Sequence, residues 1–180
     1  ARRFISQSIS FVCSPSGTGL TDEETPLYLR APATVRPFVE SVASLERQTL
    51  EARGMSGTVL RYGWLYGPGT SWDPNGFIAR AVREGNYPIV GAGAGTYSFI
   101  SLRDAATATV SALAHDATGI YNVVDDSPAT LSEWLPFAAK LLGAPPPRHE
   151  DVSAARKRIG DLRVYYMTEQ RGASNAKAKR

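Results

Sequence analysis

Residues 60–70, LRYGWLYGPGT, constrain the fold of this chain more than any other segment. The apolar run that leads to Tyr62 is typical of the end of a buried strand, and the YGPG sequence at 66–69 predicts a sharp turn. Glycine tolerates a positive φ and proline fixes φ, so the backbone path is dictated locally. Ligands of open α/β sheets bind at the carboxyl ends of the strands, and we therefore expect a ligand-facing edge at this turn.

The composition is that of one globular domain with a sizeable core. Of the 180 residues, 43% are hydrophobic and 21% are charged, which is ordinary for a folded chain. No segment approaches the ~20 consecutive apolar residues of a membrane span, so we expect no membrane association.

The small positive charge is concentrated at the end of the chain. Lys and Arg total 20 against 17 Asp and Glu, and the last ten residues contain Arg171, Lys177, Lys179 and Arg180 without an acid. Because no basic stripe interleaved with aromatic residues is present, we interpret these residues as a solvated segment and expect no nucleic-acid partner.

Metal and disulfide chemistry are not expected. Cys13 is the sole cysteine, and the two histidines, His115 and His149, lie far apart without ligand spacing. A single cysteine excludes an internal disulfide and a cysteine-based zinc site. A reducing, cytoplasmic compartment is the best fit for such a chain.

Strand-like and helix-like segments alternate along the chain, which predicts βαβ units and a parallel sheet. The expected strands are 3–12, 58–62, 87–90, 97–100 and 119–123. The expected helices are 35–52, 75–84, 104–114, 130–142 and 152–159, followed by a short helix capped by Ser174.

Two helices have more specific signals. In the helix 35–52, apolar residues recur at a spacing of three or four and predict the buried face; they are Val35, Phe38, Val42, Leu45, Thr49 and Ala52. Thr130 is followed three residues later by Glu133, which is the spacing of a capping box.

The chain contains one glycine-rich run, GAGAG at 91–95. A loop that cradles a pyrophosphate needs a helix directly after its glycines. The run lies between two strand-like segments, and no helix is expected before 104. The sequence therefore predicts a hairpin or wide turn here.

Five segments are similar, in order and spacing, to one known family. Residues 60–69 resemble the LR-x-x-N-x-YGPG segment of the extended short-chain dehydrogenases/reductases, the NAD-dependent epimerase/dehydratase family. The other segments resemble the family's RFV-x-x-S strand, its F-I-H-V-x-D segment, its G-x-YNV strand and the segment before its terminal LGW. They are residues 3–8, 98–104, 119–123 and 171–177.

The resemblance implies an α/β fold, consisting of the C-terminal part of a Rossmann-like parallel-sheet domain plus a small mixed α/β substrate-side region. Residues 1–72 and 101–128 are expected to form the former, and residues 73–100 and 129–180 the latter. The resemblance also implies NAD or NADP as cofactor and a small-molecule substrate. The family's dinucleotide fingerprint has no counterpart here, so we expect the chain to be a fragment.

The family's mechanism uses a tyrosine and a lysine four residues apart on one helix, where the lysine lowers the tyrosine pKa. The resemblance places Phe38 and Val42 at these positions, and neither side chain transfers a proton. No tyrosine lies between Tyr28 and Tyr62, and no lysine precedes Lys140, so the usual dyad is absent from this helix under any register.

The resemblance further implies candidate site residues. Ser8 is the best match to the catalytic serine, with Ser10 as the alternative, although a serine at a strand end equally bonds neighbouring backbone. Trp64 replaces an asparagine that contacts nucleotide sugars in family members, which argues against a nucleotide-sugar substrate or for a smaller, more apolar pocket. The candidates for cofactor binding are Ser6, Gln7, Tyr62 and Gly63. Those for substrate binding are Phe38, Trp64, Tyr66 and Arg171.

Two functions remain open on this reading. The first is an NAD(P)-binding oxidoreductase or epimerase acting on an unidentified small molecule without the usual dyad. The alternative is a non-catalytic nucleotide-sensing or scaffold protein with the same fold. Family members dimerise through the helix that matches 35–52, so a homodimer is expected by analogy. A half sheet has a free edge, and we expect the chain expressed alone to aggregate or dimerise.

Overall fold

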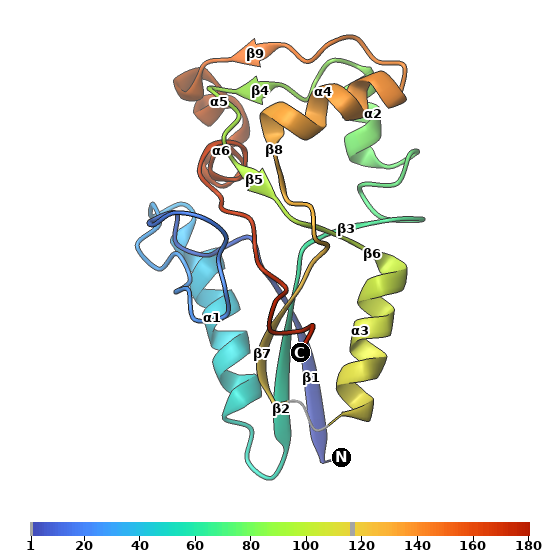
Figure 1. The fold of residues 1–180 in the computed structure, drawn as a ribbon. Helices are drawn as coiled ribbons and strands as arrows, with labels where there is room; N and C mark the ends of the chain where they lie inside the picture. Colours follow the sequence, from blue (N-terminus) through green and yellow to red (C-terminus); the bar gives the residue numbers. More distant parts are fainter. Residues whose placement is uncertain (1, 116–117) are drawn as a thin grey trace.

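The computed structural model describes residues 2–115 and 118–180 and confirms the predicted α/β fold. Three parallel strands in the order β1-β2-β7 form the main sheet; they are β1 (Arg3–Ile9), β2 (Ser56–Tyr62) and β7 (Gly119–Val123). Helix α1 (Arg36–Leu50) covers one face and α3 (Leu102–Ala114) the other (Figure 1). Strand β1 begins at the lower end of the molecule in this view, and the chain ends beside the sheet.

Alternation along β2 directs its side chains to both helices. Arg61 hydrogen-bonds Glu46 of α1, whereas the Tyr62 hydroxyl contacts Thr109 and the Ala105 carbonyl of α3. A strand covered on both faces reads as a nearly continuous apolar run, which explains why the sequence signal at 58–62 was clear.

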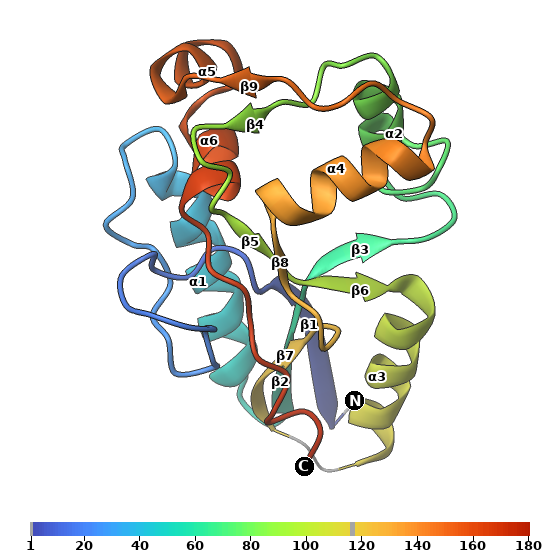
Figure 2. The same cartoon turned by 45° about the horizontal axis from the view of Figure 1, so that its top comes forward.

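The rest of the chain forms a smaller region of short strand pairs and helices beyond the carboxyl ends of the sheet (Figure 2). The parallel pairs are β3 (Trp64–Tyr66) with β6 (Phe99–Ser101) and β4 (Ile89–Val90) with β9 (His149–Glu150); β5 (Thr96–Tyr97) pairs antiparallel with β8 (Ala129–Thr130). The helices are α2 (Phe77–Arg83), α4 (Leu131–Leu141), α5 (Val152–Ile159) and α6 (Asp161–Thr168).

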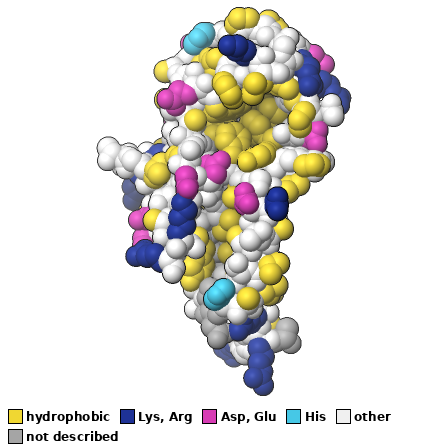
Figure 3. Space-filling view, turned by 45° about the vertical axis from the view of Figure 1, so that its right-hand side comes forward, with side chains coloured by type: hydrophobic (Ala, Val, Ile, Leu, Met, Phe, Trp, Pro, Cys, Tyr) yellow, Lys and Arg dark blue, Asp and Glu magenta, His cyan; other side chains and the backbone are white. Residues whose placement is uncertain are grey.

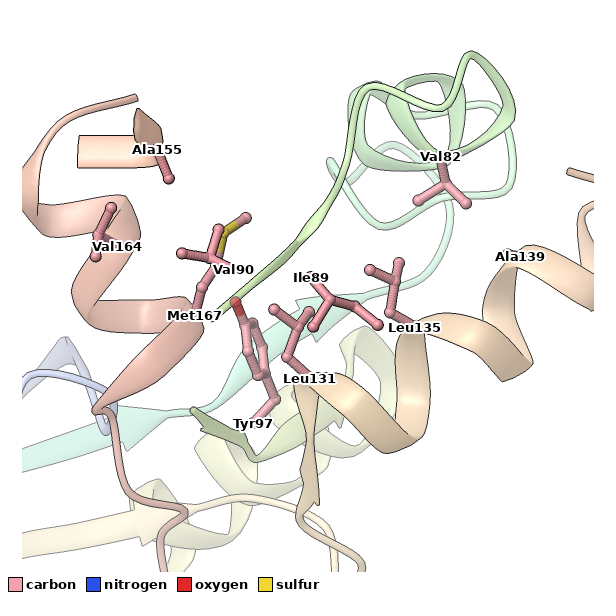
Figure 4. Close-up of a cluster of buried hydrophobic side chains, with 10 residues drawn as sticks. All are labelled: Val82, Ile89, Val90, Tyr97, Leu131, Leu135, Ala139, Ala155, Val164 and Met167. Atoms are coloured by element: carbon pink, nitrogen blue, oxygen red, sulfur yellow. The ribbon is translucent and has the colours of Figure 1, made fainter. Parts of the chain in front are cut away.

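This smaller region has its own hydrophobic core, to which every one of its helices contributes (Figure 4). Tyr97, Leu131 and Leu135 are at most 1% exposed at its centre. A separate cluster around Leu60 and Ile100 joins the main sheet to α3. The division of the chain at the predicted domain boundaries stays a prediction.

Local signals in the sequence predicted several elements well. The capping box at the start of α4 is present, with the Glu133 carboxylate accepting from the backbone N–H of Thr130 at 2.8 Å. The glycine run 91–95 is a wide turn, because β4 and β5 pair with β9 and β8 rather than with each other.

Two expectations were wrong within the described residues. The chain after Ser174 forms turns rather than a helix, since residues 171–177 are held by bonds to other segments, such as that from the Asn175 amide to the Val124 carbonyl at 2.8 Å. The apolar face predicted for α1 was wrong at Phe38 and Leu45, which are each 39% exposed; Thr49 and the preceding Val35 are buried as predicted, and Val39 and Glu46 are buried with them. Glu46 turns inward because it pairs with a buried arginine of the sheet, and the apolar spacing could not show this.

Helix α6 was not expected from the sequence.

Within the described part of the chain, no helix is long and apolar enough to cross a membrane.

Candidate active site

The chain leaves the main sheet at Gly63 and enters the smaller region. The Gly63 N–H donates to the Val123 carbonyl at 3.1 Å, and the Trp64 N–H donates to the Ser98 carbonyl at 2.8 Å. A Cβ atom added at Gly63 would lie 2.3 Å from the Ser98 carbonyl oxygen, so only glycine fits. The close crossing of these two backbones fixes where the next side chain, the indole of Trp64, is placed.

The predicted turn follows directly after β3. Gly67 and Gly69 have φ angles of +128° and +80°, and the Thr70 N–H donates to the Gly67 carbonyl at 3.2 Å. These are left-handed conformations that favour glycine. The turn sends the chain across to Trp72 and α2, which form the far side of a cavity.

Trp64 lies at the centre of an aromatic cluster. Its ring stacks on Phe11 with centroids 3.9 Å apart and an interplanar angle of 12°. Tyr166 meets it edge-on at 5.0 Å, and Tyr97 and Trp72 lie at 5.4 Å and 5.9 Å. Such contacts hold aromatic side chains rigidly, because each ring restricts the rotation of its neighbours. The cluster connects the edge of the sheet to α6.

A cavity of about 720 Å³ opens beside this cluster. Its walls include the aromatic residues Trp64, Trp72, Phe77, Tyr87, Tyr97 and Tyr166. A hollow with hydrophobic walls is visible in the upper part of the molecule, in the region where these residues lie (Figure 3). The volume is within the usual range for small-molecule sites, which are mostly apolar with a few placed polar groups.

Three charged residues line the cavity: Glu84, Arg158 and Arg163. Arg158 is held by two hydrogen bonds to the Glu150 carboxylate, and Glu84 accepts from the Asn86 amide at 3.1 Å. No ion pair is formed by Arg163 with any residue in the described ranges. Among the described residues, Arg163 and Glu84 are therefore the two charged groups of the cavity without an ion-pair partner.

The tyrosines of the cavity keep their protons at neutral pH. Burial raises the pKa of the Tyr87, Tyr97 and Tyr166 hydroxyls above the usual value of 10.0. A protonated hydroxyl can donate a hydrogen bond. The raised pKa is the opposite of the family's mechanism, in which a nearby lysine lowers the tyrosine pKa.

Ser8, the predicted catalytic residue, lies away from the cavity on the α1 face of the sheet. Its hydroxyl donates to Glu46 Oε1 at 2.6 Å, and the Arg61 guanidinium donates to both oxygens of Glu46, at 2.8 Å and 2.7 Å. The side chains of Glu46 and Arg61 are 6% and 4% exposed. Ser8 thus completes a buried charge pair, and its catalytic role stays a prediction.

The predicted cofactor residues lie at or near the carboxyl end of β1 and β2. The Ser6 hydroxyl accepts a hydrogen bond from Thr49 at 2.9 Å, and the Tyr62 hydroxyl bonds with Thr109 of α3. Gly63 lies where its backbone crosses close to that of Ser98. The side chain of Gln7 is exposed. Their contacts with a dinucleotide also stay predictions.

Among the predicted substrate residues, within the described ranges, Trp64 alone lines the cavity. Phe38 and Tyr66 are partly exposed outside it. Arg171 binds the loop that contains Ser16, donating to its carbonyl at 2.6 Å and to the Thr18 carbonyl at 2.7 Å. Its guanidinium also contacts two further carbonyls of that loop, so its contact with substrate stays a prediction.

Sequence reasoning missed most of the cavity wall. Trp72, Tyr87, Tyr97 and Tyr166 come from four separate segments and share no local periodicity. The composition gave no clear signal, because Trp64 and Trp72 fall in the predicted Rossmann-like part and Trp134 in the predicted substrate-side region. No cluster of His, Cys, Asp or Glu among the described residues could hold a metal ion.

Comparison with known proteins gives a consistent result. Residues 2–124 match the model of the NAD dependent epimerase/dehydratase family. A curated protein of a Streptomyces species, named 3-diazoavenalumate denitrifying reductase, is 43% identical over 184 residues. That alignment covers 99% of this chain and 59% of the relative, so the chain spans less than two thirds of the relative's length.

Solved structures show the same fold at low sequence identity. The human epimerase family protein SDR39U1 (isoform 2) with NADPH has a TM-score of 0.75 and 19% identity, covering 99% of this chain and 59% of that one. The dTDP-glucose 4,6-dehydratase DesIV of Streptomyces venezuelae, with NAD and TYD bound, has a TM-score of 0.72 and 19% identity, covering 98% and 52%.

Proposed function

Because this chain belongs to the NAD dependent epimerase/dehydratase family, we propose that it is part of an NAD(P)-dependent reductase that binds a small-molecule substrate in the aromatic cavity. The observation that carries the proposal is the position of the cavity, whose wall begins with Trp64 immediately beyond the carboxyl end of β2. Ligands of open parallel sheets bind at that edge. The relative at 43% identity, which is named a reductase, supports the class of reaction.

The residues present fit one end of a dinucleotide. The described residues form no phosphate loop, because the carbonyls of Gly93 and Gly95 accept from Ser132 and Leu131 at the start of α4. At the carboxyl edge of β1 and β2, the exposed Gln7 and the backbone around Gly63 would face the nicotinamide end. The hydroxyls of Ser6 and Tyr62 are occupied by protein partners, and the Tyr62 carbonyl accepts from the Ser10 N–H at 3.0 Å, so the proposal assigns the cofactor contact to Gln7 and to the segment around Gly63.

A bound reduced nicotinamide supplies a hydride, and the protein supplies binding, orientation and electrostatics. The chain's residues suit a reaction that does not pass through the usual dyad. Phe38 and Val42 stand where tyrosine and lysine would act, and the cavity tyrosines are protonated donors. The walls of the cavity exclude water from around the substrate, and Tyr166 donates a hydrogen bond to an acceptor on it.

The second candidate is a nucleotide-sensing or scaffold protein without turnover. The same two departures, Phe38 and Val42, favour it, since neither can take part in proton transfer. The two candidates differ in whether the cofactor is consumed.

Oxidation of NADPH and NADH by the intact protein, with a panel of carbonyl and other electrophilic compounds, tests the proposal. We expect steady cofactor oxidation with some of them and a lower kcat/KM in Trp64→Ala. The matched control is Phe137→Ala, which removes an aromatic ring that is 65% exposed on α4 and does not line the cavity. Tight cofactor binding without turnover on any compound would refute the reductase and support the scaffold.

A homodimer through α1 is part of this proposal. Phe38 and Leu45 are each 39% exposed and Leu50 is 41% exposed on one helix. Light scattering on the wild type and on Leu45→Glu measures the association, and a monomeric wild type would contradict it.

A further inference from the structure

The geometry points to a planar aromatic carboxylate as the substrate class of the cavity, with its ring against the aromatic wall and its carboxylate on Arg163. The inference rests on the proposed function in that it assigns the substrate to the same cavity. It goes further in naming the two chemical features by which the substrate is recognised.

The walls select a flat, apolar ligand. Trp64 and Trp72 cross at 63° with centroids 5.9 Å apart, and Tyr97 and Tyr166 complete the same face. A ring that lies against this wall of differently inclined aromatic rings can gain stacked and edge-on contacts together. A saturated ring of equal size gains only the free energy of burying its apolar surface, because it lacks the π-electron quadrupole that favours stacked and edge-on contacts.

The charge is provided by α6. Arg163, Tyr166 and Met167 are three and four residues apart, so they share one face of α6, and all three line the cavity. Of the two arginines at the cavity, Arg158 already binds Glu150. Arg163 has no such partner within the described residues, and its guanidinium can take a carboxylate in a two-pronged contact.

The third charged group of the cavity, Glu84, sharpens the choice of ligand. Its carboxylate accepts from Asn86 and disfavours a second negative charge nearby. A nucleoside diphosphate would bring two phosphates to a cavity whose one arginine without an ion-pair partner is opposed by Glu84, and the described residues offer no phosphate loop to receive them. A monoanion with an apolar body is the better match to this combination of one free arginine, one glutamate and an aromatic wall.

Binding to the intact protein can be followed by intrinsic fluorescence, because the chain's three tryptophans all lie at this cluster. Trp64 and Trp72 line the cavity, and Trp134 lies 5.3 Å from Trp72. Four probes separate the features: 3-phenylpropanoate, its neutral amide, the saturated 3-cyclohexylpropanoate, and UDP. We expect 3-phenylpropanoate to bind about tenfold or more tightly than each of the other three, which corresponds to one charge-assisted hydrogen bond or one set of ring contacts.

Arg163→Gln is expected to reduce the Kd difference between the carboxylate and the amide to within about twofold, while binding of the amide is unchanged. Arg80→Gln is the matched control, since Arg80 is an exposed arginine of α2 that does not line the cavity. Circular dichroism of each variant verifies folding.

Equal affinity for the carboxylate and the amide in the wild type would overturn the inference, as would an unchanged ratio in Arg163→Gln or stronger binding of UDP. The reductase proposal fails separately. Binding of 3-phenylpropanoate as expected, with no cofactor oxidation by any electrophile, refutes the reductase and leaves the ligand class standing. Cofactor oxidation without any preference for binding aromatic carboxylates refutes the ligand class and leaves the reductase standing.

Discussion

Removing the negative charge of Glu46 should destabilise the protein strongly, because it leaves a buried arginine without its ion-pair partner. Glu46→Gln leaves the Arg61 guanidinium 3% exposed, beneath α1, with an amide in place of a carboxylate. Breaking a buried ion pair by removing one partner costs about 3–5 kcal/mol, because the remaining charge stays desolvated. Whole-domain stabilities are about 5–15 kcal/mol, so the loss is a large share of the total.

Urea unfolding followed by tryptophan fluorescence measures this loss. With a slope of ~2 kcal/mol/M, the midpoint is expected to fall by about 2 M. Ser8→Ala removes one hydrogen bond to the same carboxylate and should cost only about 1 kcal/mol. Glu150→Gln breaks the Arg158 pair, in which the arginine side chain is 42% exposed, and should cost at most about 1 kcal/mol.

The double variant Glu46→Gln with Arg61→Met tests the reason for the effect. Once the buried cation is gone, the amide no longer faces an unpaired charge, so the double variant should be more stable than the sum of the single losses implies. The reasoning would be refuted if Glu46→Gln cost no more than Glu150→Gln, or if the two single losses simply added.

Three further substitutions and conditions have defined expectations. Gly63→Ala should destabilise the protein by about 2–3 kcal/mol in urea unfolding, because the new Cβ meets the Ser98 carbonyl oxygen at 2.3 Å; an unchanged midpoint would contradict this. Gln170→Met should raise the free energy of unfolding by about 1 kcal/mol, because both amide atoms of Gln170 are buried without a partner among the described residues; a loss would show that the amide has a role. Burial raises the pKa of the Cys13 thiol above 9.0, so the unfolded chain releases that proton first and stability should decline as the pH rises above about 9. Urea midpoints between pH 7 and pH 11 test this, and Cys13→Ala should remove the part of the decline that begins near pH 9 while leaving the later part due to the tyrosines.

The sequence was sufficient where the signal is local. The run before Tyr62 predicted a buried strand because neighbours on both faces are apolar, and Thr130 with Glu133 predicted the start of a helix because a capping box spans only four residues. The turn at 66–69 followed from glycine and proline in the same way, and the turn at 91–95 followed from glycines placed between two strand-like segments.

It was insufficient where the deciding partner is distant in the chain. Glu46 is buried because Arg61 lies opposite it, and no spacing within α1 could reveal that. Helix α6 has eight residues, follows Gly160 and has no side-chain cap, so nothing local marks its beginning. The cavity combines segments as far apart as Trp64 and Met167, and its existence depends on the whole arrangement.

The contacts of Arg171 have a consequence for the order of events during synthesis. Its guanidinium holds carbonyl oxygens of the loop at 16–20, and Thr21 forms a bridge with Ala173. Partners about 150 residues apart meet only after a large loop closes, which is slow relative to local contacts. We therefore expect the loop at 16–20 to be protease-sensitive on a ribosome-bound chain and to become protected last, once the segment around Arg171 has emerged.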